Sequence, residues 1–324
     1  QGKRSLTLNL KAAEGQAILH QLVPTADVLI EQFRPGVARE LGVDYQTLAP
    51  LQPDLIYCSF SGFGAVGPYR TRPAHDINFL ALAGGLDRGK AGDPAVPPVP
   101  AADISSAMLA AFGIVAALLE RERTGGGRFL DLSLFDAALQ LNQVALVAGE
   151  TFLTGTTPGY ALYRTADDRF LSLGALEERF WDRLCTAIER PDLRDLDWGR
   201  EEDLERARLA LQDTFLGRSV EEWDNLLARF DVPAAPVRKS GEVAEDPHVE
   251  AMGALVASEA GGPRLSLAHP IRWKKPGPAR RGSSPRLGQH TREILHDLGY
   301  EEERILDLDR RGVVELNESE PTSP

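Results

Sequence analysis

A strand–helix–strand rhythm at the start of the chain constrains the fold more than any other feature. Apolar and polar residues alternate over residues 5–10 (SLTLNL), as in a half-buried strand. Residues 14–23 follow the period of a helix, and compact apolar runs at residues 26–30 and 55–60 are further strand candidates. Because strands that alternate with helices form parallel sheets, this rhythm predicts an α/β fold with a parallel sheet covered by helices.

The middle of the chain predicts a long, buried helix. Residues 103–122 are apolar nearly all round, Asp103 stands where an N-cap is expected, and glycines at 125–127 end the pattern. A helix that is apolar on every side is usually surrounded by protein. Residues 129–134 then alternate as a strand does, and residues 135–148 predict another apolar helix.

The pattern changes after residue 151, which predicts a second, smaller domain. Residues 163–174 have the pattern of a hairpin, and charged amphipathic helices are expected at residues 177–189, 203–216 and 220–230. Two linkers rich in Gly and Pro are expected at residues 88–100 and 279–285. A last helical pattern covers residues 287–307, and a polar tail at residues 317–324 is expected to be disordered. We expect a large α/β domain at residues 1–150, a small α+β domain with linkers at 151–278, and a C-terminal segment at 279–324.

Charge and composition exclude several classes of partner. The chain carries 36 Lys and Arg against 48 Asp and Glu, a net charge of −12, which argues against duplex nucleic acid or an anionic membrane as the main partner. The longest apolar run, residues 107–119, is too short to span a bilayer, so no membrane insertion is expected. Cys58 and Cys185 form no metal-ligand spacing and cannot make a disulfide framework, which favours the cytoplasm.

The segment at residues 72–85, RPAHDINFLALAGG, contains the most informative polar residues. His75, Asp76 and Asn78 stand together where an apolar helix begins, which suggests a polar cluster at the edge of the sheet. Each candidate also has a purely structural interpretation. His75 would be a structural histidine, Asp76 and Asp103 would be N-caps, and Glu177 would be solvated surface. No P-loop, GxSxG, HExxH or CxxC motif occurs, so no metal site is predicted.

Several segments together resemble the class III CoA-transferase superfamily. They follow one another along the whole chain at residues 3–11, 26–37, 55–64, 67–85, 127–139, 172–181, 232–237, 246–249 and 287–295. The His-Asp-Ile-Asn sequence at residues 75–78 is similar to the α-methylacyl-CoA racemase branch in particular. The resemblance implies a Rossmann-like, CoA-binding large domain, a smaller domain, and an interlocked homodimer in which the C-terminal segment returns to the large domain.

The resemblance also implies roles for individual residues. His75 matches the base on one face of the substrate α-carbon, Asp103 the acid/base on the other face, Asp76 a neighbour of the histidine, and Glu177 a supporting glutamate from the partner subunit. The residues that match CoA-contacting positions are Leu8, Asn9, Leu10, Lys11, Arg34, Ala74, Ile77, Asn78 and Phe79. The substrate would be an acyl-CoA thioester, with coenzyme A part of the substrate and no other cofactor required.

The chemistry of epimerisation agrees with these residue types. A thioester α-proton is weakly acidic, so its removal needs a base of near-neutral pKa and a group that stabilises the enolate oxygen. His75 supplies such a base, and backbone N–H groups of the helix that begins near Ile77 are candidates for the enolate. Asp103 must be partly protonated to return a proton, so we expect burial to raise its pKa.

Three alternatives stay open at this stage. Asp103 could instead be the nucleophile of a CoA-transferase that forms a mixed anhydride. Asp136 is a weaker candidate for either role, and its structural interpretation is a helix cap. The chain could also be a truncated, inactive paralogue that only binds CoA or a partner. Full-length members of the superfamily begin with about fifty more residues of the nucleotide-binding half, including a CoA-contacting arginine. Ala74 and Phe79 stand where racemases commonly have Gly and Tyr.

Overall fold

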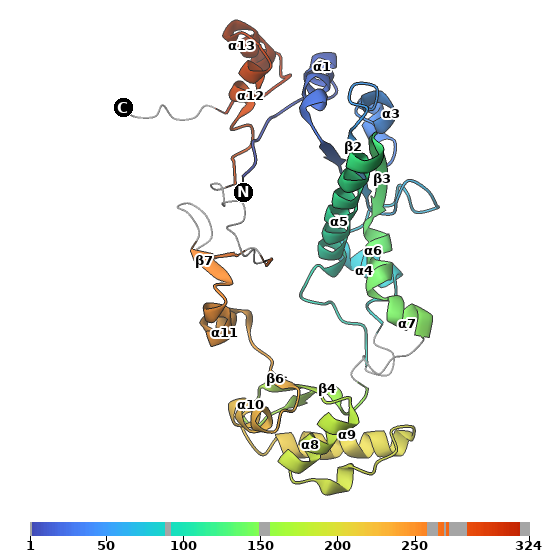
Figure 1. The fold of residues 1–324 in the computed structure, drawn as a ribbon, viewed down its shortest axis with the longest axis vertical. Coiled ribbons are helices and arrows are strands. Elements are labelled where there is room, and N and C mark those ends of the chain that lie inside the picture. Colours follow the sequence, from blue (N-terminus) through green and yellow to red (C-terminus); the bar gives the residue numbers. More distant parts are fainter. Residues whose placement is uncertain are drawn as a thin grey trace. The chain divides into compact units, whose positions relative to one another are not determined.

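The computed structural model describes residues 2–87, 92–148, 156–257, 265–268, 270–271 and 284–317. The chain forms two compact units (Figure 1). Unit 1 comprises Gln1–Gly85, Pro97–Leu141 and Ala254–Pro324, and unit 2 comprises Leu86–Val96 and Asn142–Gly253. Most of the linker expected at 279–285, and the tail beyond residue 317, lie outside the described residues.

A three-stranded parallel sheet forms the centre of unit 1, as the strand–helix rhythm predicts. Its order is β1 (Val28–Glu31), β2 (Ile56–Ser61) and β3 (Arg128–Ser133). Tyr57 and Cys58 are buried because they lie in the central strand, which has a neighbour on each side, and because packed elements cover both faces of a parallel sheet. The strand predicted at residues 5–10 is wrong, since this segment pairs with no strand of the sheet.

The N-terminal segment is instead held by the C-terminal end of the chain. The Asn9 N–H donates to the Val313 carbonyl over 2.8 Å, and the Thr7 hydroxyl donates to the Glu315 carbonyl over 2.7 Å. Leu8 packs against one apolar cluster, which includes Ile18 and both C-terminal helices, and Leu10 packs against a second cluster. The alternating leucines Leu8 and Leu10 therefore pack into two separate apolar clusters, and they do not mark one face of a strand in a sheet.

The helices of unit 1 are mostly short. Their bounds are α1 (Ala13–Leu22), α2 (Val37–Glu40), α3 (Tyr45–Leu48), α4 (Asp76–Leu82), α5 (Ala101–Thr124), α6 (Leu134–Leu141), α12 (Thr291–Asp297) and α13 (Glu302–Arg310), with a 3-10 turn at Val23–Thr25. The helix predicted over 287–307 is two helices, because Gly299, with φ +86°, interrupts the chain between α12 and α13. A short hairpin, β7 (Leu255–Ala257) and β8 (Leu265–Leu267), completes the described elements of this unit.

The long helix α5 corrects two expectations. It begins at Ala101 with Pro100 as the N-cap, so Asp103 lies inside the first turn and is not the N-cap. Its buried residues are small, at Ala102, Ser106, Ala110 and Ala117, which lets the helix pack closely on α6, β2 and β3. The opposite side is exposed in the single chain, where Phe112 is 74% exposed, so the prediction of a wholly buried helix is wrong.

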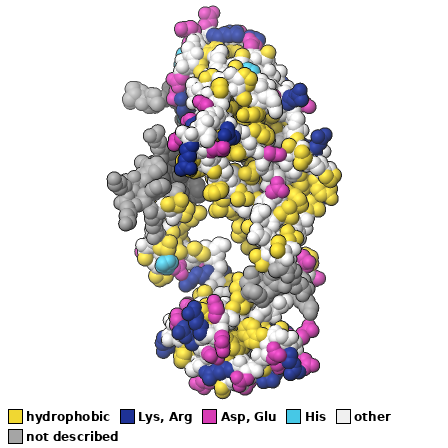
Figure 2. Space-filling model, turned by 45° about the vertical axis from the view of Figure 1, so that its right-hand side comes forward, with side chains coloured by type: hydrophobic (Ala, Val, Ile, Leu, Met, Phe, Trp, Pro, Cys, Tyr) yellow, Lys and Arg dark blue, Asp and Glu magenta, His cyan; other side chains and the backbone are white. Residues whose placement is uncertain are grey.

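By length and composition α5 could cross a membrane, because the helix has 24 residues and contains an 18-residue stretch with a mean hydropathy of 1.9, although its uninterrupted apolar run at 107–119 is shorter than a bilayer needs. That is weak support for a span, since core helices of soluble proteins have the same properties. Figure 2 shows hydrophobic side chains exposed over much of the visible surface of unit 1.

Unit 2 closes its own core. The antiparallel sheet β4 (Tyr160–Arg164), β5 (Phe170–Gly174) and β6 (Ala234–Pro236) packs with α8 (Glu178–Ala187), α9 (Glu201–Phe215) and α10 (Val220–Arg229). Among the described residues of this unit, the remaining elements are α7 (Gln143–Ala148), α11 (Pro247–Ala251) and 3-10 turns at Pro191–Leu193 and Ser240–Glu245. The helix predicted over 135–148 is thus split at Asn142 into α6 and α7, whereas the hairpin and the three charged helices are confirmed.

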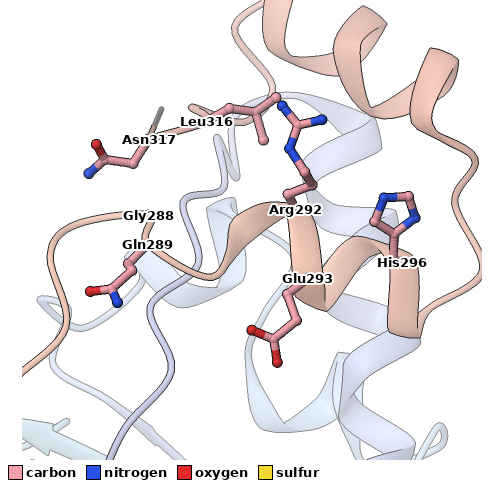
Figure 3. Close-up of a pocket in the computed structure, with 7 residues that line it drawn as sticks. All are labelled: Gly288, Gln289, Arg292, Glu293, His296, Leu316 and Asn317. Atoms are coloured by element: carbon pink, nitrogen blue, oxygen red, sulfur yellow. The ribbon is translucent and has the colours of Figure 1, made fainter. Parts of the chain in front are cut away.

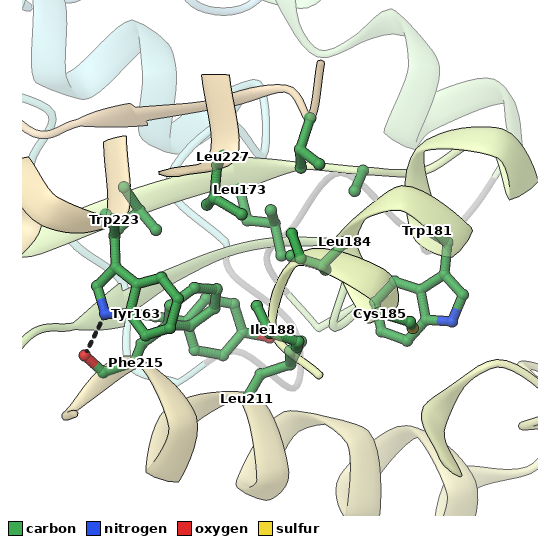
Figure 4. Close-up of a cluster of buried hydrophobic side chains, with 14 of the residues drawn as sticks. Tyr163, Leu173, Trp181, Leu184, Cys185, Ile188, Leu211, Phe215, Trp223 and Leu227 are labelled. Carbon is green, nitrogen blue, oxygen red and sulfur yellow. Dashed lines mark hydrogen bonds between the residues drawn. The ribbon is translucent and has the colours of Figure 1, made fainter. Parts of the chain in front are cut away.

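The core of unit 2 is built from aromatic and leucine side chains (Figure 4). The Phe215 ring lies between Tyr163, to which it is tilted, and Trp223, which it meets edge-on, with ring centroids 5.1 Å from each. The Trp223 indole N–H donates to the Phe215 carbonyl over 2.9 Å, which satisfies the one polar group that this buried ring carries.

Candidate functional site

The start of α4 presents His75 and Asp76. His75 is the N-cap, in extended conformation, and its backbone N–H donates to Asn78 Oδ1 over 3.0 Å. The interpretation of Asp76 as the N-cap is therefore wrong by one position, because Asp76 is already the first residue of the helix. Asn78 holds the turn that carries His75, whose side chain is exposed.

The other face of α4 anchors it to unit 1. Phe79 and Leu80 are buried, and the Phe79 ring meets Phe63 edge-on with centroids 5.1 Å apart. Ile77 is exposed and Ala74 is half-buried. Of the four residues that match CoA positions here, Phe79 and Asn78 hold the helix and its first turn, while Ala74 and Ile77 keep accessible surface.

Asp103 meets this cluster from the first turn of α5. The Asp103 backbone N–H donates to Asp76 Oδ1 over 3.0 Å, although 27 residues separate them in the chain. The structure thus brings His75, Asp76 and Asp103 together where α4 and α5 begin.

Neighbouring atoms change the acidity of Asp103. Asp103 is exposed at the surface, but partial desolvation of its carboxyl raises the pKa, the nearby Asp76 carboxylate raises it further, and His75 opposes the change. This is the direction expected from the sequence, with burial as the first cause. Asp103 therefore keeps its proton to a higher pH than an ordinary aspartate does.

Glu177 lies in unit 2. It is exposed and stands directly before α8, where its carbonyl accepts hydrogen bonds from the Phe180 and Trp181 N–H groups. Glu177 is therefore not part of the cluster that His75, Asp76 and Asp103 form within unit 1.

The remaining candidate CoA residues form two groups: some pack into the apolar clusters of unit 1, and others are exposed and charged. Leu8 and Leu10 pack into apolar clusters, and the Asn9 side chain accepts from the Lys11 N–H, leaving Lys11 exposed. Arg34 is also exposed, in the loop after β1.

The Arg34 loop is fixed at its base by a buried glutamate. The Glu31 carboxylate accepts hydrogen bonds from the Phe33 N–H over 2.7 Å and from the Ser59 hydroxyl of the next strand. Sequence reasoning missed Glu31, although its place at the carboxyl end of β1 could have drawn attention to it.

Asp136 has a local structural role. Its carboxylate accepts from the Ser133 hydroxyl over 2.7 Å, and its backbone N–H donates to the same oxygen over 2.9 Å. This reciprocal pair holds the corner between β3 and α6, but the residue in the cap position is Ser133, so the interpretation of Asp136 as the helix cap is wrong: Asp136 lies inside the first turn of α6.

A concave region away from this cluster, which the sequence did not suggest, lies beside α12 (Figure 3). The cavity measures about 240 Å³ and is lined by Gly288, Gln289, Arg292, Glu293, His296, Leu316 and Asn317. Its ionisable side chains already have partners: Arg292 and His296 contact Glu302, and Glu293 pairs with Arg4. Across the described residues, no group of three or more His, Cys, Asp or Glu side chains could hold a metal ion.

Comparisons with known proteins identify the family. The model of CoA-transferase family III matches residues 1–291. The human protein named alpha-methylacyl-CoA racemase is 32% identical over 98% of this chain and 86% of its own length. The beta subunit of succinyl-CoA–L-malate CoA-transferase from Chloroflexus aurantiacus is 29% identical over 96% of this chain and 82% of its own length.

Solved structures share the fold. The crystal structure of Rv3272 from M. tuberculosis has a TM-score of 0.79 at 26% identity and covers 91% of this chain and 81% of that chain. A CAIB/BAIF family protein from Brucella suis has a TM-score of 0.76 at 28% identity, covering 92% of this chain and 82% of that one. The relatives named for racemase and for transferase chemistry stand at similar identity, so the site must guide the choice between them.

Proposed function

The chain belongs to CoA-transferase family III, and on that basis we propose that it is an acyl-CoA epimerase of the α-methylacyl-CoA racemase type. The single observation that carries the proposal is the meeting of His75 and Asp103 at the starts of α4 and α5, joined through Asp76. Epimerisation of a thioester requires a proton-transfer group on each face of the α-carbon, and a histidine and an aspartate of raised pKa are suited to these two positions.

In the proposed reaction, the His75 imidazole removes the α-proton from one face of the α-carbon. The carbon–hydrogen electron pair then forms the enolate, whose oxygen the first backbone N–H groups of α4 would stabilise. Protonated Asp103 donates its proton to the opposite face, which inverts the configuration. In the reverse direction the two residues exchange roles, so each must be able to hold and release a proton near neutral pH.

Coenzyme A enters as part of the substrate. Its phosphates would meet exposed basic side chains of unit 1, of which Lys11 and Arg34 are the candidates. Arg4 is already bound in an ion pair with Asp297, at 2.7 Å, and is a weaker candidate.

We also propose that the protein works as a homodimer in the cytoplasm. Met108, Phe112, Val115 and Leu119 recur at helical spacing along one side of α5 and are exposed in the single chain. A contiguous apolar stripe of this kind usually marks an interface. The partner subunit would cover it and bring Glu177 of its small unit towards His75, as the family resemblance implies.

Deuterium uptake tests the function. Incubation with a chiral 2-methylacyl-CoA in D₂O should introduce deuterium at the α-carbon, and His75→Ala should slow uptake by roughly 10²–10⁴-fold, the usual contribution of a general base. His248→Ala, which removes an exposed histidine of unit 2, is the matched control. Uptake that His75→Ala leaves unchanged would exclude the assignment.

Transfer of CoA between acids is the second candidate, because a relative named as a CoA-transferase matches almost as much of the chain. Asp103 would then attack the thioester carbonyl, form a mixed anhydride and expel the CoA thiolate. Hydroxylamine or borohydride would trap that adduct on Asp103. A trapped adduct without deuterium uptake would favour this alternative.

A further inference from the structure

Asp76 joins the two elements that carry the proposed acid–base pair. We propose that Asp76 is a positioning residue, whose carboxylate holds the first turn of α5 against the start of α4 and so keeps Asp103 beside His75. The inference rests on the proposed function, because the pair that Asp76 positions is the pair that would move the proton. It assigns Asp76 no proton transfer of its own.

The start of α5 lacks a cap from its own sequence. The first N–H groups of a helix have no partner within it, and an N-cap side chain normally accepts from the third one. Here the N-cap is Pro100, which makes no such bond, and Asp103 is the third residue of the helix. Asp76 accepts from the Asp103 N–H and therefore supplies from α4 the bond that a local cap would have made.

The residue that supplies this bond is itself well held. Asp76 is half-buried, and the turn before it is closed by the His75 N–H bond to Asn78. Phe79, three residues on, is buried against Phe63. A bond from a fixed helix restricts the direction in which the Asp103 side chain leaves α5, which a water molecule at the same place would not do.

Asp76 acts on Asp103 by charge as well. Its carboxylate contributes to the raised pKa of Asp103, after burial and against His75. The other ionisable groups on elements packed against α5 are engaged elsewhere or buried. Asp136 of α6 bonds to Ser133, Arg128 of β3 pairs with Glu120, Asp131 accepts from the Ala65 N–H, and Tyr57 and Cys58 of β2 are buried.

Two substitutions separate position from charge. Asp76→Asn keeps an oxygen acceptor for the Asp103 N–H but removes the charge, whereas Asp76→Ala removes both. We expect Asp76→Asn to retain deuterium uptake within about tenfold of wild type at its own optimum, and Asp76→Ala to lose about 100-fold, the scale of a displaced catalytic group. In Asp76→Asn the alkaline limb of the pH profile should move to lower pH, because Asp103 loses its proton earlier.

A carbon-13 NMR titration of aspartate-labelled protein gives a readout independent of activity. The Asp103 signal, assigned with Asp103→Asn, should titrate at lower pH in both Asp76 variants, while Asp136→Asn should leave it in place. An unmoved Asp103 titration together with equal losses of uptake in both variants would overturn the inference. If wild type itself exchanges no deuterium, the proposed function fails, and the titration still decides whether Asp76 controls Asp103.

Discussion

Helix α5 of unit 1 and helix α9 of unit 2 use apolar residues in opposite ways. In α9, Ala207, Leu211 and Phe215 face inward and are buried with the aromatic core of their own unit (Figure 4). In α5 the buried residues are small, and the large apolar side chains, such as Met108 and Phe112, are exposed. Helix α9 therefore buries its large apolar residues within its own unit, whereas α5 leaves a stripe of large apolar residues exposed in the single chain.

The two units also begin their helices differently. Helix α10 starts with a local capping box, in which the Ser219 hydroxyl accepts from the Glu222 N–H and the Glu222 carboxylate accepts from the Ser219 N–H. Helix α5 starts at Pro100 without a side-chain cap and takes its bond from Asp76 on another helix. A helix start that depends on a distant residue couples the fold of unit 1 to its candidate site.

The largest expected effect is on the apolar stripe of α5. Phe112→Asp should place an unpaired charge in the proposed interface at two symmetric positions, at about 3 kcal/mol or more for each. We expect the dimer to dissociate, as measured by analytical ultracentrifugation, and deuterium uptake to fall with it. Leu209→Asp introduces the same charge on the exposed face of α9 and serves as the control. Identical sedimentation of the two variants would contradict an interface at α5.

A smaller loss is expected in the core of unit 2. Leu211→Ala leaves a cavity beside Phe215 and should lower the free energy of unfolding by about 3 kcal/mol. Urea denaturation followed by tryptophan fluorescence reports on this unit, because three of the four tryptophans, Trp181, Trp198 and Trp223, lie in it. Leu209→Ala, on the exposed side of the same helix, should change stability by less than about 0.5 kcal/mol. If the two substitutions lowered the free energy of unfolding equally, the difference in burial between Leu211 and Leu209 would not contribute to stability.

The smallest effect should come from the local cap of α10. Ser219→Ala removes the acceptor of the Glu222 N–H and should cost about 1 kcal/mol in the same urea experiment. Ser219→Asp keeps an acceptor and should restore most of that loss. Deuterium uptake should remain at the wild-type level in both, since the cap of α10 is closed within unit 2. A fall in uptake that tracks the loss of the cap would show that the two units are coupled more closely than their separate cores suggest.

Sequence patterns predicted most of the elements because local periodicity and turn chemistry specify them. The parallel strands, the hairpin of unit 2 and its charged helices follow from alternation and amphipathicity. The strand predicted at residues 5–10 failed because the same alternation also suits an extended segment packed between two clusters. Helix α5 was expected to be buried because its apolar residues go all round, but a pattern cannot say whether its own chain or another covers them.

The candidate site divides in the same way. The residue types at His75, Asp76 and Asp103, and the family whose model matches residues 1–291, are properties of the sequence alone. Their meeting is not, because the Asp103 N–H and the Asp76 carboxylate approach only when α4 and α5 pack together. Partial burial and the neighbouring charge then raise the pKa of Asp103. Sequence determined which groups are available, and tertiary packing decided which of them lie close together, since a hydrogen bond needs atoms within about 3 Å and the interaction between two charges weakens as their distance grows.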